Sequence, residues 1–68
     1  MYIFYLLNKN IIITGDEKGR IIQWKIENDN LTLIAKKENA HDDEIYTLTK
    51  LDNGLILSGS CDKSVKIW

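Results

Sequence analysis

The stretch Leu57-Ser58-Gly59-Ser60-Cys61-Asp62-Lys63-Ser64-Val65-Lys66-Ile67-Trp68 contains two β-rich runs around a short polar turn. Short segments of Asp, Ser, Asn or Gly between such runs are typical of antiparallel hairpins, because these residues tolerate turn conformations. The stretch therefore predicts a hairpin that ends at a tryptophan.

The same pattern occurs a second time, earlier in the chain. A shift of 44 residues, the spacing between Trp24 and Trp68, places residues 1–24 over residues 45–68 without a gap. Five positions are then identical: Tyr2 and Tyr46, Leu7 and Leu51, Ile12 and Ile56, Gly15 and Gly59, Trp24 and Trp68. Self-similarity at a period of this size indicates a stack of similar units.

Both units have the composition of strands. The expected strands are Tyr2–Leu7, Ile11–Asp16, Arg20–Ile26, Leu31–Lys36, Ile45–Leu51, Leu55–Ser60 and Val65–Trp68. The runs 11–13 and 55–57 are apolar without alternation, which predicts strands that are covered on both faces. Residues 31–36 alternate better, apart from Ile34, and suit a half-exposed outer strand. The alternative for residues 31–44 is a helix.

The C-terminal stretch resembles the end of a WD40 repeat (the G-protein beta-type WD repeat), which commonly runs Ser-Gly-Ser-x-Asp-x-x-Val-Lys-Ile-Trp. Ala40-His41 stands where that family has Gly-His, and the 44-residue spacing fits its period of about 40–45 residues. The resemblance is strong over residues 40–68 and weaker, but in register, over residues 1–39.

This resemblance implies an all-β fold, a partial β-propeller with one four-stranded antiparallel blade plus three strands of a second. Residues 1–39 would form a first, degenerate WD40-like blade, and residues 40–68 a second WD40 repeat that lacks its outer strand. The first unit departs from the family pattern because Lys18 stands where the second has Asp62, and its opening Gly-His would precede Met1. Lys25 follows Trp24 where the family has Asp.

The resemblance also implies a structural hydrogen-bond network of His41, Ser58, Asp62 and Trp68. His41 would bond Asp62, while Ser58 would bond His41 and accept the indole N–H of Trp68. These residue types can satisfy one another, because Trp only donates, ionised Asp only accepts, and Ser and neutral His do both. Thr14 and Trp24 are partial equivalents in the first unit.

Two functional interpretations compete with this structural one. His41 and Cys61 could form a nucleophile–base pair with Asp42 or Asp62 as the orienting acid, but no Gly-rich elbow or oxyanion-hole candidate accompanies them. His41-Asp42-Asp43-Glu44 offers ligands for Ca²⁺ or Mg²⁺, but it lacks EF-hand spacing and the turn glycine. We therefore expect no catalytic residue, no metal and no cofactor, and a solvated acidic loop.

In a propeller, the loop before a blade and the turn between its second and third strands emerge on one face. That geometry would bring Asp42, Asp43 and Glu44 beside Lys18 and Lys63 as a candidate partner-binding face. Three adjacent acids favour a basic protein or peptide segment as the partner.

Composition excludes several classes of protein. The chain has 68 residues, 44% of them hydrophobic, and a net charge of −1, which argues against disorder and against nucleic-acid binding. The longest apolar run, Tyr2–Leu7, is far shorter than the roughly 20 residues of a membrane span. A single cysteine, Cys61, favours an intracellular location, the cytoplasm in particular.

Chains shorter than roughly 70–80 residues rarely build a sufficient core alone. We therefore expect a fragment or an obligate partner, and we expect the isolated chain to associate or to need further blades. The function expected is that of a non-catalytic scaffold for protein–protein interaction and complex assembly. The alternative is a self-assembling structural module that completes a propeller by homo-oligomerisation.

Overall fold

A computed structural model describes residues 2–68. Met1, the first residue of the proposed repeat and of the proposed first blade, lies outside the described residues. Seven strands follow one another along the chain: β1 (Tyr2–Asn8), β2 (Ile11–Asp16), β3 (Ile21–Glu27), β4 (Asn30–Lys37), β5 (Ile45–Lys50), β6 (Ile56–Ser60) and β7 (Val65–Ile67). Within residues 2–68 no helix is long and apolar enough to cross a membrane. The helix considered for residues 31–44 is wrong, because β4 and a loop of turns and bends occupy this stretch.

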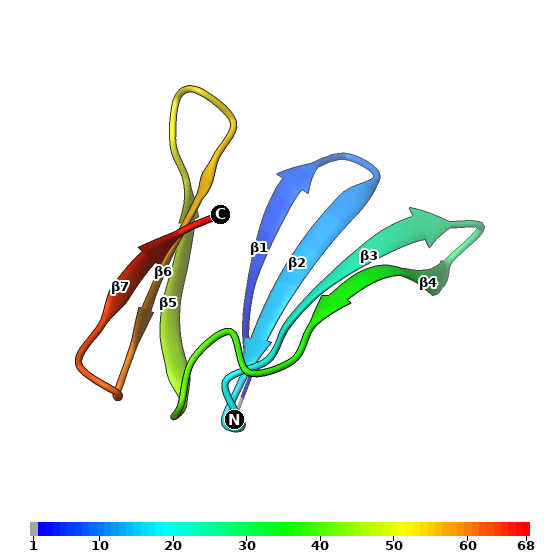
Figure 1. Cartoon of the computed structure of the whole chain (residues 1–68). Coiled ribbons are helices and arrows are strands. Elements are labelled where there is room, and N and C mark those ends of the chain that lie inside the picture. The colour runs from blue at the N-terminus through cyan, green and yellow to red at the C-terminus, as the bar shows by residue number, and fades with distance from the viewer. Residues whose placement is uncertain (1) are drawn as a thin grey trace.

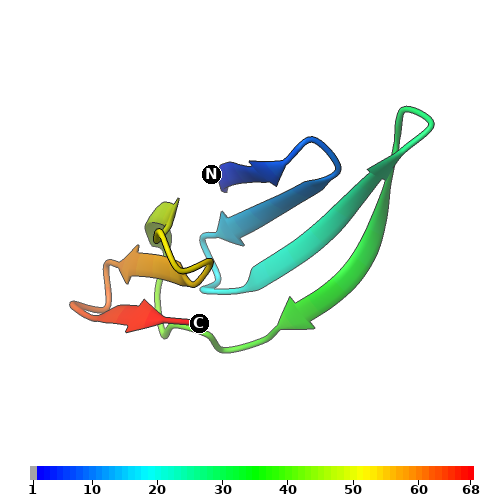
Figure 2. The ribbon, with the colours of Figure 1, turned by 90° about the horizontal axis from the view of Figure 1, so that it is seen from above.

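The strands form two antiparallel sheets. The first sheet has the order β1-β2-β3-β4 and the second the order β5-β6-β7. β5 packs against β1 and β2, so the sheets meet along their first strands (Figure 1). Seen from above, both sheets run in the same direction from their first strand to their last (Figure 2). The expected all-β class, one four-stranded blade plus three strands of a second, is confirmed.

The core lies between the sheets. Its buried apolar residues are Ile13, Ile21, Ala40, Ile45, Leu48 and Ile56. Full burial of a side chain such as Ile45 stabilises the fold by about 1.5–3 kcal/mol. A Cβ atom at Gly15 would lie 2.8 Å from Cγ2 of Ile45, so glycine at this position permits β2 to approach β5.

The faces that point away from this core are open. Ile12 lies half-buried on the outer face of β2, whereas its neighbour Ile13 is 6% exposed. Leu55 precedes β6 and is 41% exposed. Coverage on both faces, expected for residues 11–13 and 55–57, is therefore wrong within the described chain, because no second layer covers the outer faces.

β4 differs from the expected half-exposed strand, because every residue in it is exposed. Among residues 2–68 it packs against β3 alone. The register shifts between Gln23, which pairs with Ala35, and Trp24, which pairs with Leu33. Ile34 is thus the extra residue of a β-bulge, which explains why it interrupts the alternation.

Candidate functional site

Four side chains, one from the β4–β5 loop and three from the second sheet and its turn, form one hydrogen-bonded cluster. His41 lies in the β4–β5 loop, Ser58 on β6, Asp62 in the β6–β7 turn and Trp68 after β7. Nε2 of His41 lies 2.7 Å from Oγ of Ser58, and Nδ1 lies 3.1 Å from Oδ2 of Asp62. The indole N–H of Trp68 donates to Oγ of Ser58 at 2.8 Å. We call these four residues the loop cluster.

One arrangement of protons satisfies the whole loop cluster. Neutral His41 donates from Nδ1 to Asp62 and accepts at Nε2 the hydroxyl proton of Ser58, which in turn accepts the indole proton. His41 is 1% exposed and Ser58 is 0% exposed. Within residues 2–68 every buried side-chain nitrogen and oxygen has a hydrogen-bond partner. A buried network of this kind stabilises a unique loop conformation, because an unpaired member would cost about 1–3 kcal/mol.

Two serines, for which the sequence predicted no role, extend the cluster. Ser64 Oγ donates to Oδ1 of Asp62 and lies 3.0 Å from Nδ1 of His41. Ser60 Oγ donates to the carbonyl oxygen of Glu44 at 2.8 Å and accepts the N–H of Asp62 at 3.1 Å. Both serines lie two residues from Asp62, a spacing at which polar side chains commonly bond turn backbone, and this was the available signal.

Asp62 is the anionic centre of the cluster. Its pKa is lowered well below the ordinary range, first by the Ser64 hydroxyl and then by the backbone N–H of Asp42, with smaller contributions from His41 and the Ser64 N–H. Burial opposes this shift only in part. The carboxylate therefore accepts bonds from the loop and from its own turn at once.

The first sheet contains a smaller version of this arrangement. The indole N–H of Trp24 donates to Oγ1 of Thr14 at 3.1 Å. Oγ1 of Thr14 lies 3.5 Å from the carbonyl oxygen of Ile22. Within the described residues, the Trp–hydroxyl pair is thus present in both sheets, while the His and Asp members occur only in the second.

Asp16 replaces the turn aspartate that the first unit lacks at position 18, a role that was not predicted from the sequence. Its Oδ1 accepts the N–H of Lys18 at 2.9 Å and that of Arg20 at 3.0 Å, while Oδ2 pairs with Nε of Arg20 at 2.7 Å. Burial alone would raise the pKa of Asp16, but the hydrogen bonds from Arg20 and Lys18 outweigh it and lower the pKa. The spacing of Asp16 and Arg20, four residues apart in a turn that contains Gly19, was the feature of the sequence that could have indicated this role.

The predicted partner-binding face is assembled from three segments. Asp42, Asp43, Lys18 and Lys63 are exposed, and Glu44 is half-buried. The N–H of His41 donates to the carbonyl of Gly19 at 3.0 Å, and the N–H of Cys61 donates to the carbonyl of Glu44 at 2.9 Å. The β2–β3 turn, the β4–β5 loop and the β6–β7 turn therefore lie together at one end of the molecule (Figure 1). We call this end the loop face.

The structure does not bring together the residues that the catalytic and the metal-binding alternatives require. Both ring nitrogens of His41 bond Ser58, Asp62 or Ser64 rather than Cys61, which is an exposed free thiol. Among residues 2–68 no three His, Cys, Asp or Glu side chains are arranged to hold a metal ion.

The chain is similar to three curated proteins. ASTRA-associated protein 1 of Scheffersomyces stipitis is 41% identical over 64 residues, which is 94% of this chain and 14% of that protein. The protein of the same name from Debaryomyces hansenii is 35% identical over 65 residues, 96% of this chain and 13% of that protein. Regulatory-associated protein of TOR 1 of Arabidopsis thaliana is 36% identical over 64 residues, 85% of this chain and 4% of that protein.

The chain thus spans about one seventh of the length of the two ASTRA-associated proteins. No family model matches it. No solved structure matches it either.

Proposed function

We propose that this chain is a segment of a WD40-type β-propeller, with units at residues 1–39 and 40–68, and that it serves as a non-catalytic scaffold for protein–protein interaction and complex assembly. The observation that supports this most is that the polar side chains of the loop cluster are bonded to one another and to the backbone. His41, Ser58 and Asp62 bond one another and the adjoining backbone, at distances of 2.7–3.1 Å. Side chains so engaged fix the shape of a surface rather than act on a substrate.

The similar proteins support the same role. Two of them are named for association with ASTRA and the third for association with TOR. We infer that the present chain also contributes to a multiprotein assembly. Together with the lone, exposed Cys61, this favours an intracellular, cytoplasmic site of action.

The loop face is the surface that we assign to partner binding. Asp42 and Asp43 project from a loop whose backbone is held by Asp62 and Gly19. Such rigid presentation lowers the entropic cost of binding. Acidic side chains on it favour a partner segment that contains Lys or Arg, through faster and more selective encounter.

The test compares two isosteric triple variants in affinity purification of the tagged full chain from extract. Asp42→Asn, Asp43→Asn and Glu44→Gln remove three charges from the loop face. Glu27→Gln, Asp29→Asn and Asp52→Asn remove three charges from the hairpins at the opposite end. We expect the first set to lose specific proteins by quantitative mass spectrometry and the second to retain them. Identical recoveries would remove the loop face from the proposal.

A second candidate is the self-assembling module, which the open sheet faces favour. Phe4 is 65% exposed and occupies the repeat position of Leu48, which is buried between the sheets; Val65 is 66% exposed and occupies the position of Ile21, which is also buried. Each open face therefore presents residue types of a face that is covered inside the chain. Native mass measurement separates the candidates, because a ring-sized homo-oligomer favours self-assembly over the scaffold segment.

A further inference from the structure

A groove of about 450 Å³ lies between the two sheets. Its walls are mainly apolar and come from both sheets: Leu7, Ile13, Ile21, Ala35, Ile56 and Trp68. Gln23 and two lysines, Lys36 and Lys37, are its polar lining. A volume in the range of roughly 300–1,000 Å³ with few polar groups is typical of ligand sites in proteins.

Trp68 gives the groove a fixed wall. Its indole N–H donates to Ser58, and its ring lies edge-on to His41, with centroids 6.5 Å apart. The ring orientation is therefore set by the loop cluster before any ligand arrives. An aromatic surface held in this way binds an apolar side chain with little loss of entropy.

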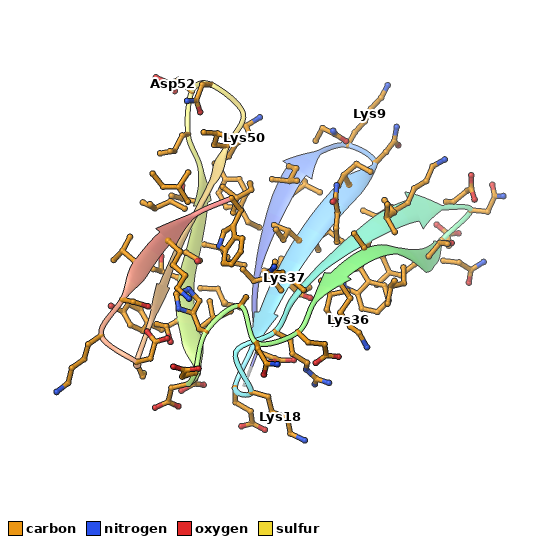
Figure 3. All side chains as sticks on the ribbon, in the orientation of Figure 1. Lys9, Lys18, Lys36, Lys37, Lys50 and Asp52 are labelled. Carbon is orange, nitrogen blue, oxygen red and sulfur yellow. The ribbon has the colours of Figure 1, made fainter. Side chains whose placement is uncertain are left out.

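The charge at the groove is positive. Lys36 pairs with Glu38 at 3.0 Å, whereas the ammonium of Lys37 lies 5.7 Å from the centroid of the Trp68 ring. Figure 3 shows Lys37 between the two sheets. No carboxylate of the described residues lines the groove or forms an ion pair with Lys37. An anion beside Lys37 would thus meet an exposed ammonium at the edge of an apolar groove, and a bound peptide that covers this ammonium would strengthen the attraction relative to open water.

We propose that this groove binds an extended peptide segment of a protein partner, with an apolar side chain against Trp68 and an adjacent Asp or Glu at Lys37. Gln23 presents an amide that both donates to and accepts from the peptide backbone. This proposal rests on the scaffold function and adds a second contact surface to the loop face.

The experiment uses the full chain and a capped, fluorescein-labelled hexapeptide of three Leu-Glu repeats. Hexapeptides of Leu-Lys and of Ser-Glu repeats isolate charge and apolar contact respectively. We expect the Leu-Glu peptide alone to raise fluorescence anisotropy, and its affinity to fall as salt rises. Equal binding of the Leu-Lys or the Ser-Glu peptide would overturn the proposal.

Variants locate the site. Lys37→Glu should weaken the Leu-Glu peptide by about tenfold or more, whereas Lys9→Glu, the same charge reversal in the distant β1–β2 turn, should change affinity by less than about twofold. Gln23→Glu, nearly isosteric within the groove, should also weaken binding and covers the case in which Lys37→Glu does not fold. Equal losses in the Lys9 and groove variants would refute a site in the groove.

The fluorescence of the two tryptophans shows on which face the peptide binds. In Trp24→Phe the remaining Trp68 should change emission on peptide addition, and in Trp68→Phe the remaining Trp24, on the far face, should not. A Trp68 shift that follows chain concentration without peptide, and that persists in Ile67→Lys, would show a second copy in the groove and overturn the proposal. Absence of peptide binding while the loop-face variants still lose partners would refute the groove alone. If the peptide does not bind and the loop-face variants also retain all their partners, the scaffold function is refuted as well.

Discussion

The turn residue Gly19 lies directly against the backbone of His41. Its carbonyl oxygen accepts the His41 N–H at 3.0 Å, its φ is 79°, and a Cβ atom built on it would overlap the carbonyl of His41. The β2–β3 turn of the first sheet thus supports the loop that contains the central histidine of the second. The two sheets are joined by backbone contact at their loop ends as well as by the apolar core.

Gly19→Ala should destabilise the chain much more than Gly54→Ala. Gly54 has a similar φ of 87°, but a Cβ atom there meets nothing within 4 Å, so its substitution costs only backbone strain, about 1–2 kcal/mol. Gly19→Ala adds a clash with backbone and should cost about 3 kcal/mol or more. Urea denaturation at one chain concentration measures both, and equal costs would mean that the loop contact does not contribute.

Ser58→Ala should cost more than Thr14→Ala. Removal of the Ser58 hydroxyl leaves the Trp68 N–H and the His41 Nε2 without their partner in a buried site, for a loss of about 2–4 kcal/mol. Thr14→Ala leaves one half-buried indole, for a loss of about 1 kcal/mol. The comparison is made by urea denaturation, with near-ultraviolet circular dichroism to follow the tryptophans. The reverse order would contradict a stabilising role for the loop cluster.

The stability of the chain should fall in acid, and Asp62 and Asp16 should account for part of the fall. Both have a pKa below the ordinary value in the folded chain, while in the unfolded chain Asp titrates near about 3.9. Their contribution is therefore complete above about pH 5 and is lost as the pH falls through 4 toward the lower folded values. Asp62→Asn and Asp16→Asn should be less stable than the wild type at pH 6.

At pH 2 the same two variants should approach wild-type stability, because the carboxylates of the wild type then lose their advantage. Urea midpoints between pH 6 and pH 2 test this. A pH profile of Asp62→Asn that stays parallel to the wild type would show that the Asp62 bonds do not favour the ionised form.

The isolated chain should associate through its open faces. Phe4 and Leu6 are 65% and 56% exposed on one face, and Val65 and Ile67 are 66% and 60% exposed on the other. Sedimentation should give masses above the monomer that rise with concentration, and Phe4→Lys or Ile67→Lys should lower them. A monomeric profile with a sharp, concentration-independent melt would contradict this expectation.

Most of the fold follows from the repeat. Strand boundaries agree with the expected ranges to within one residue, because Asn, Asp and Gly separate the strands and determine where turns form. The exposure of β4 did not follow, because alternation indicates which face is apolar but not whether a layer covers it. Likewise, Ile34 interrupts the pattern in the sequence, but only the pairing with β3 identifies it as a bulge.

The site was predictable where residue type alone defines the partner. His41, Ser58, Asp62 and Trp68 were expected together, and the structure brings them within hydrogen-bond distance. The role of Asp16 could not be predicted in the same way, because the 44-residue shift aligns Asp62 with Lys18 and not with Asp16. The contact between Gly19 and His41 depends on the angle between the sheets, which no residue pattern encodes.

The two hairpin turns are closed by the same backbone bond, from Gly19 to Asp16 in one and from Lys63 to Ser60 in the other. The supporting carboxylate, however, sits at the start of the first turn and in the middle of the second. In an alignment of the two units, Asp16 stands opposite Ser60 and Asp62 opposite Lys18, so each unit seems to lack an aspartate that the other has. In the structure, however, each turn has one aspartate that accepts backbone N–H groups of that turn. Divergent copies of such a unit are therefore better recognised by the hydrogen bonds that close and support each turn than by residue identity at each aligned position.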